Sequence, residues 1–336
     1  MRQLNINMTN TILFIGNGFD LALNLKTSYK DFINSPFWPL LDKKFPSKSD
    51  GSLEWEIFSF TEKYRDKETG LVRWIDLENV IYKYAKRLKE NNPISISSEI
   101  VDRNKLFLNI LKKAFSEYIR NIVNVSIDPK VNKASKEICS IFKGILEMDS
   151  STVIYSFNYT DTSNIFTKYF NWSNPNVTHM HGRINELTSN IILGINDRNI
   201  VDKSHRFLLK SHQEGFGSNS LFDDLHESQN IIFYGMSFGS NDIDYFKDFF
   251  NSIILMEDKR KYRKNIFIFT KDEESIASIK SFFEDADVSV RDLYLHANLH
   301  FYKASSFTTE EKENSHLSSF LKFCQDNKPL FVSGII

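Results

Sequence analysis

Short apolar runs alternate with longer helical patterns along most of this chain. Six runs predict strands: Thr11–Ile15, Val153–Phe157, Ile191–Leu193, Ile231–Tyr234, Ile266–Phe269 and Leu299–Tyr302. Each run is apolar on both faces and is bounded by polar residues or glycine, which is typical of buried parallel strands. Helical patterns lie between several of these runs. The sequence therefore predicts an α/β fold, an open parallel sheet with helices on both faces.

The stretch between the first two predicted strands has helical periodicity instead. Three apolar stripes recur at helical spacing: Trp74, Leu77, Ile81, Tyr84 and Leu88; then Leu108, Leu111, Phe115, Ile119 and Ile122; then Ile138, Ile141, Phe142 and Ile145. We interpret residues 36–149 as a large helical insertion or cap. The α/β domain would then be discontinuous, formed by residues 9–35 and 150–305, and residues 306–336 would add a C-terminal helix.

Composition excludes several classes of protein. The formal net charge of -1 gives no electrostatic argument for binding to nucleic acid or to a membrane surface. Two distant cysteines, Cys139 and Cys324, exclude a disulfide framework and a Cys-x-x-Cys zinc module. No stretch looks like a signal peptide or approaches the length of a membrane helix. We expect a cytoplasmic protein with reduced thiols and no resident metal.

The first predicted strand ends in the turn Gly16-Asn17-Gly18, and a helix follows. A glycine turn at a helix N-terminus presents backbone N–H groups and the positive end of the helix dipole to an anion. The dinucleotide fingerprint requires a small residue three positions after the second glycine, where this chain has Leu21. The sequence therefore does not match a dehydrogenase-type dinucleotide site, and a tight turn without ligand is the alternative to a phosphate site.

Polar residues also follow two later segments. Asn158 comes directly after the run Val153–Phe157, at the end of the sheet where open α/β folds bind ligands. Its amide could orient a ribose hydroxyl or a water, although a local Asx-turn is an alternative. In "THMHGRI", His179 and His181 would share one face of a strand. His181 precedes a glycine, so it would lie at a strand end or turn, where a base can reach a ligand.

The segment "GMSFG", from Gly235 to Gly239, matches the nucleophile-elbow pattern of α/β-hydrolases. Ser237 would be the nucleophile, and Asp272 followed by His296 or His300 could complete a triad. That fold places most of its sheet before the elbow, where this chain has its long helical stretch.

The alternative interpretation makes Gly235 and Ser237 a second turn that contacts a ligand. Asp242 or Asp244 would then cap the following helix or touch the ligand. This interpretation also gives the earlier glycine, asparagine and histidine segments a role in one common site.

Five segments together resemble the AbiH family of phage abortive-infection proteins. They are "GNGFDLALNLKTSYKDF" (Gly16–Phe32), "WIDLE" (Trp74–Glu78), "FNYT" (Phe157–Thr160), "HMHG" (His179–Gly182) and "YGMSFGSND" (Tyr234–Asp242). They cover most of the chain in the order of the family. The family is similar to sirtuin-like NAD-binding proteins, which carry a glycine turn, a later Asn, a catalytic His before Gly, and a Gly-x-Ser. The resemblance implies a sirtuin-like, Rossmann-type sheet.

The resemblance also implies roles for individual residues. Asn158 would contact the nicotinamide ribose and help place the attacking water, and His181 would act as the base. The residues implied to contact NAD are Gly16, Asn17, Gly18, Asp20, Thr27, Gly235, Ser237 and Asp242. Asn17 and Asp20 stand where sirtuins have Ala and Ser. The zinc ribbon of sirtuins has no counterpart, so NAD hydrolysis fits better than protein deacylation.

The expected function is that of an abortive-infection effector, an NAD glycohydrolase that depletes NAD on infection and needs no further cofactor. One alternative is a sensor that binds NAD or a nucleotide derivative without turnover. The other is a serine hydrolase with Ser237 as nucleophile. An effector that depletes NAD must be silent in a healthy cell. The helical insertion is expected to gate it, through a phage-encoded trigger, a partner defence protein or a homo-oligomer contact.

Overall fold

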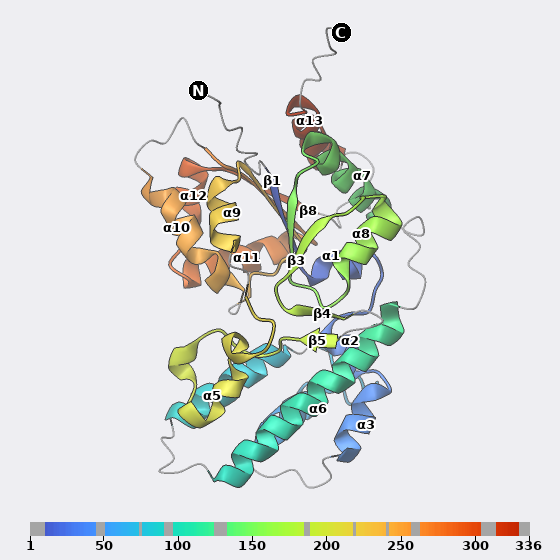
Figure 1. Ribbon diagram of the computed structural model, residues 1–336, viewed down its shortest axis with the longest axis vertical. Coiled ribbons are helices and arrows are strands. Elements are labelled where there is room, and N and C mark those ends of the chain that lie inside the picture. The colour runs from blue at the N-terminus through green and yellow to red at the C-terminus, as the bar shows by residue number, and fades with distance from the viewer. Residues whose placement is uncertain are drawn as a thin grey trace.

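The computed structural model describes residues 11–44, 51–73, 76–90, 97–123, 133–184, 189–217, 220–239, 242–256, 263–303 and 314–328. A six-stranded parallel sheet forms its centre, in the order β3-β2-β1-β6-β7-β8 (Figure 1). The strands are β1 (Thr11–Ile15), β2 (Val153–Ser156), β3 (Asn176–His179), β6 (Asn230–Tyr234), β7 (Asn265–Thr270) and β8 (Asn298–Lys303). The first strand, β1, lies in the middle of the sheet; β2 and β3 follow on one side of it, and β6, β7 and β8 follow on the other. This doubly wound, Rossmann-like order confirms the predicted fold class.

Helices cover both faces of the sheet (Figure 1). Ile12 and Phe14 of β1 face one core, which is closed by α9 (Leu221–Glu227), α10 (Lys247–Leu255), α11 (Glu273–Asp285) and α12 (Val290–His296). Leu13 and Ile15 face the other core, which is closed by α1 (Asn17–Ala22), α7 (Lys133–Met148), α8 (Thr162–Phe170) and α13 (Asn314–Asp326). All residues of β1 are buried, because both of its faces and both of its edges are covered.

A separate helical unit, which we call the cap, lies beyond one end of the sheet (Figure 1). Its core is built from α2 (Tyr29–Ile33), α3 (Phe37–Lys44), α4 (Leu53–Lys63), α5 (Leu77–Glu90) and α6 (Ser98–Val123), together with apolar residues between Ile184 and Leu209. The first two predicted stripes fall on α5 and α6, except that Trp74 lies outside the described residues. The third stripe falls on α7, which packs on the sheet.

One predicted strand differs from the structure, and one observed strand was not predicted. Of the run Ile191–Leu193, only Ile191 is in a strand: β5 (Ser189–Ile191) pairs antiparallel with β4 (Gly182–Ile184), outside the main sheet. The run is apolar because it packs in the cap core. The sixth strand is β3, whose polar sequence is typical of a partly exposed edge strand. Within the predicted C-terminal helix, α13 packs on α7, and residues 304–313 and 329–336 lie outside the described part.

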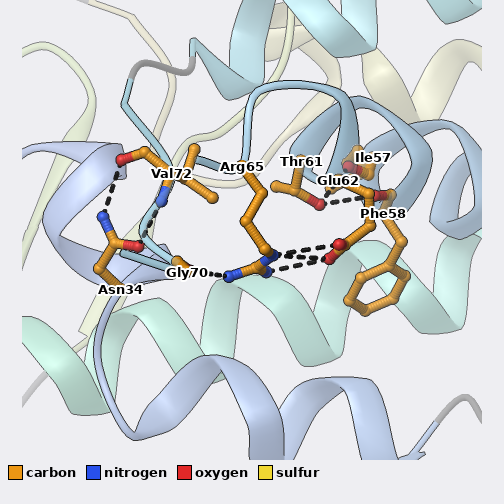
Figure 2. Close-up of polar contacts among 8 residues, drawn as sticks. All are labelled: Asn34, Ile57, Phe58, Thr61, Glu62, Arg65, Gly70 and Val72. Atoms are coloured by element: carbon orange, nitrogen blue, oxygen red, sulfur yellow. Dashed lines mark hydrogen bonds and ion pairs between the residues drawn. The ribbon is translucent and has the colours of Figure 1, made fainter. Parts of the chain in front are cut away.

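Polar contacts fix the segment that leads into α5. The side chain of Asn34, at the end of α2, pairs with the backbone of Val72 in both directions, at 2.9 and 2.8 Å (Figure 2). Arg65 joins Glu62 to the carbonyl oxygen of Gly70, at 2.9 and 2.6 Å respectively (Figure 2). These bonds hold the described part of the chain between α4 and α5 against α2. None of the described helices is long and apolar enough to cross a membrane.

Candidate functional site

A cavity of about 660 Å³ lies at the carboxyl edge of the sheet. Its floor is formed where β1 and β6 end, which is the topological switch point at which open α/β folds bind ligands. The cap contributes Asp76, Glu78, Phe115 and Ile119 to the wall. The volume falls within the roughly 300–1,000 Å³ that is usual for ligand sites. All the predicted site residues line this cavity: Gly16, Asn17, Gly18, Asp20, Thr27, Asn158, His181, Gly235, Ser237 and Asp242.

The two glycine turns pack against each other, backbone to backbone. The N–H of Gly16 donates to Tyr234 O and that of Gly18 to Gly235 O, each at 2.9 Å. A Cβ on Gly18 would lie 2.6 Å from Gly235 Cα, and one on Gly235 would lie 2.5 Å from Phe19 N. Gly235 also has a φ of +66°. The glycines are thus needed for the packing of the two turns, and the N–H groups of Gly16 and Gly18 are already bonded within the protein.

A buried carboxyl group orients the amide of Asn158. Asp20, 1% exposed, accepts hydrogen bonds from Asn158 Nδ2 at 2.9 Å and from Thr160 Oγ1 at 3.0 Å. Burial raises the pKa of Asp20 to about 7, although its hydrogen bonds with Thr160 and Asn158 act in the opposite direction. In this hydrogen bond the amide nitrogen donates and the carboxyl oxygen accepts, so Nδ2 points toward Asp20. The buried Oδ1 of Asn158 then has no hydrogen-bond partner among the described residues.

The loop after α1 closes over the same side of the cavity. Thr27 Oγ1 donates to Asn17 Oδ1 at 2.7 Å, which ties this loop back to the glycine turn. Ser28 then begins α2 with a capping box to Asp31. The position of Thr27 is therefore set by local sequence on both sides.

His181 forms the centre of a second polar group. It lies in the turn between β3 and β4 and is 5% exposed. Its Nε2 lies 3.1 Å from Lys210 Nζ, and the same Nζ donates to Glu78 Oε2 at 2.9 Å. Burial, and then the charge of Lys210, hold the pKa of His181 well below its usual 6.5. His179, at the end of β3, lies outside the cavity wall, so the two histidines do not share one site.

Three carboxyl groups surround this second group. Burial raises the pKa of Glu78 to about 7 and that of Asp242 to about 6. The charge of Lys210 lowers both pKa values, whereas Asp76 raises both. The charge of each of these carboxyl groups therefore affects the pKa of its neighbours. Within the described ranges, no group of three or more His, Cys, Asp or Glu side chains is placed to hold a metal ion.

Sequence reasoning did not assign Lys210, Asp76 or Glu78 to the site. Asp76 and Glu78 belong to the "WIDLE" segment, whose pattern indicates the start of an amphipathic helix. Lys210 begins the 3₁₀ segment η3 (Lys210–His212). A segment of three residues is too short to show a periodic pattern of apolar positions. No local pattern distinguishes this lysine from a solvated one.

The triad alternative finds no support in the geometry. Ser237 is exposed after the carboxyl end of β6. His296 ends α12 at the opposite edge of the sheet, just before β8 begins. The two edges are separated by the length of a strand, which is about 17 Å for the five residues of β6. His300 lies in the middle of β8, two strands away from β6. Asp272 is the N-cap of α11, where its carboxylate accepts from the backbone N–H of the third helical residue at 2.9 Å.

A doubly wound parallel sheet with a capped polar cavity at its switch point defines a Rossmann-like α/β protein with a candidate ligand site. The family model "Bacteriophage abortive infection AbiH" matches residues 12–262, a range that contains every predicted site residue. The chain belongs to the AbiH family, and this membership implies a role in phage abortive infection. No curated protein and no solved structure shows significant similarity to the chain.

Proposed function

We propose that the protein is an abortive-infection effector that hydrolyses NAD to nicotinamide and ADP-ribose. The observation that carries this proposal is the buried Oδ1 of Asn158 in the wall of the switch-point cavity, which has no hydrogen-bond partner in the described part of the chain. Open α/β folds bind nucleotides at this place. An oriented acceptor there suits a ribose hydroxyl or a water molecule.

The reaction requires positioning more than acid catalysis. The bond between ribose C1′ and the nicotinamide nitrogen breaks, and its electron pair neutralises the cationic ring. The leaving group therefore needs no proton. A water oxygen bonds to C1′ and loses one proton to a base. The protein has to hold the ribose, exclude other nucleophiles and aim the water.

Asn158 would aim the water or hold the ribose, with its amide fixed by Asp20. His181 would accept the proton once its Nε2 is accessible. Gly235, Ser237 and Asp242 would contact the ligand from the far side of the cavity. Asn17 and Thr27 would contact it from the near side, because Gly16 and Gly18 have already committed their N–H groups.

The test is proton NMR of the nicotinamide ring of NAD, followed for hours with the purified full-length protein. Signals of NAD should fall while those of free nicotinamide grow. Asn158→Ala should slow this by about 10²-fold, the usual cost of misplacing a reacting group. Asn164→Ala, an exposed amide on α8, should behave as wild type. An unchanged NAD spectrum, with neither loss nor broadening, would contradict NAD as the ligand.

A sensor that binds NAD or a nucleotide derivative without turnover is the second candidate. The contact between Lys210 Nζ and His181 Nε2 favours it, because a covered base cannot take a proton from water. Broadened NAD signals without product, together with a mass increase by light scattering when NAD is added, would support this function. A phage-encoded trigger, a partner defence protein or a second copy of the chain could then act through the cap.

A further inference from the structure

Lys210 is fully buried, although it lies in a short connecting segment. A buried ammonium group is costly unless it is paired and hydrogen-bonded. Its partners come from two other parts of the chain: Glu78 on α5, at 2.9 Å, and His181 in the β3–β4 turn, at 3.1 Å. Lys210 thus joins the cap to the turn that carries the proposed base.

The chemistry of the two groups fixes the direction of the second bond. An ammonium group has donors and no acceptor, so Nζ must donate to a lone pair on His181 Nε2. The imidazole is then neutral and carries its proton on Nδ1. Protonating Nε2 would place a second cation against Lys210, in a buried place.

We propose that Lys210 is a positioning residue of this site, which holds His181 as the neutral Nδ1–H tautomer and covers its Nε2. His181 accepts a proton only after Lys210 has moved away. Glu78 holds Lys210 in place, so this movement is coupled to a shift of α5. The tautomer follows from the contact and from the lack of an acceptor on an ammonium group, whereas the link to hydrolysis rests on the proposed function.

The surrounding charges make such a movement feasible. Asp76 and Glu78 face Lys210 from the α5 side, and Asp242 faces it from the segment after β6. Lys210 can therefore leave His181 and still be compensated by carboxylates. The imidazole also has a hydrogen bond with the backbone of Phe157, and the uncharged rings of Phe157, Tyr245 and Tyr159 lie near it, with centroids at 5.2, 6.5 and 6.1 Å.

Nitrogen NMR of full-length protein labelled with ¹⁵N-histidine tests the tautomer, with His181 assigned through its loss in His181→Gln. In wild type, Nε2 should be an unprotonated acceptor, Nδ1 should be protonated, and neither should titrate between about pH 5 and 8. In Lys210→Met, the pKa of His181 should rise by about one pH unit or more, because a neighbouring cation is lost. Lys264→Met should leave these signals unchanged, since this second buried lysine donates to backbone carbonyls of His226 and Ser228.

A wild-type His181 that carries its proton on Nε2, or that titrates near 6.5, would overturn the proposal. That spectrum needs no variant, so it decides the tautomer even if Lys210→Met does not fold. Unchanged His181 signals in a folded Lys210→Met protein would also overturn it.

Hydrolysis of NAD by Lys210→Met tests the release step. The variant should be faster than wild type at neutral pH, by up to the roughly 10²–10⁴-fold that general-base help supplies. Its rate should gain a pH step at the His181 pKa measured by NMR. A folded variant no faster than wild type would overturn the release step. If neither protein cleaves NAD while the nitrogen spectra are as expected, the proposed function fails and the positioning role stands.

Discussion

Replacing Asp20 with asparagine should stabilise the fold at neutral and alkaline pH. The carboxyl group is 1% exposed, and burial raises its pKa from 3.8 to about 7. Hydrogen bonds from Asn158 and Thr160 offset only part of the cost of burying its charge. In Asp20→Asn the amide oxygen can still accept from Asn158, and no charge has to be buried.

The size of the effect follows from the two pKa values. Below about pH 4 the carboxyl group is protonated in both the folded and the unfolded protein. Between about pH 4 and 7 only the unfolded protein has lost this proton, so the free energy of unfolding falls by about 1.4 kcal/mol per pH unit. Above pH 7 the loss is complete. With a pKa raised from 3.8 to about 7, it amounts to about 4 kcal/mol.

Urea denaturation from about pH 4 to 8 measures this difference. The stability of Asp20→Asn relative to wild type should be near zero at the acid end and grow to about 4 kcal/mol at the alkaline end. Asp285→Asn, an exposed carboxyl at the end of α11, should show no such growth. A variant less stable than wild type at pH 8, or a difference independent of pH, would refute the reasoning.

Two further substitutions test the turns around the cavity. Gly235→Ala should lower the free energy of unfolding by about 2 kcal/mol or more, since its Cβ would meet Phe19 N at 2.5 Å. Gly70 also has a positive φ, but a Cβ there would meet no atom within 4 Å, so Gly70→Ala should lower it by only about 1 kcal/mol. Equal losses in urea denaturation would contradict this account of the turn packing. Ser237→Ala should raise KM for NAD more than it lowers kcat, because the hydroxyl group would contact the ligand and not attack it. Labelling of Ser237 by a fluorophosphonate would show instead that its hydroxyl group is a nucleophile.

The central sheet was predictable because its strands are buried on both faces. Runs such as Thr11–Ile15 and Ile231–Tyr234 owe their continuous apolarity to helices on each side. The edge strand β3 has a polar, partly exposed sequence, and such a strand has no comparable signal. The run Ile191–Leu193 was wrongly predicted as a strand of the main sheet, because an apolar sequence indicates that a segment is buried but not in which core it lies.

The same distinction applies to the site. Asn158 and the two glycine turns follow strands directly, so the rule for carboxyl ends predicts that they lie together, and the cavity brings them together. Lys210 gives no such signal. Its burial depends on Glu78 and His181, which are distant in sequence and meet it only in the folded protein. A charged residue before an amphipathic helix, such as Asp76, is usually solvated, and only the tertiary structure shows otherwise.

The central position of β1 also has a consequence for synthesis on the ribosome. Ile12 pairs with Val153 of β2 on one side and with Ile231 of β6 on the other. The strand β1 is therefore synthesised long before its second neighbour, β6. At about 5–20 residues per second, the delay between β1 and β6 is roughly 10 to 40 s. The helices of the cap emerge within that delay and can begin to associate through short-range contacts. The nascent chain therefore carries a largely apolar strand without its second neighbour while the cap helices emerge, and the ligand cavity cannot exist until β6 is inserted beside it.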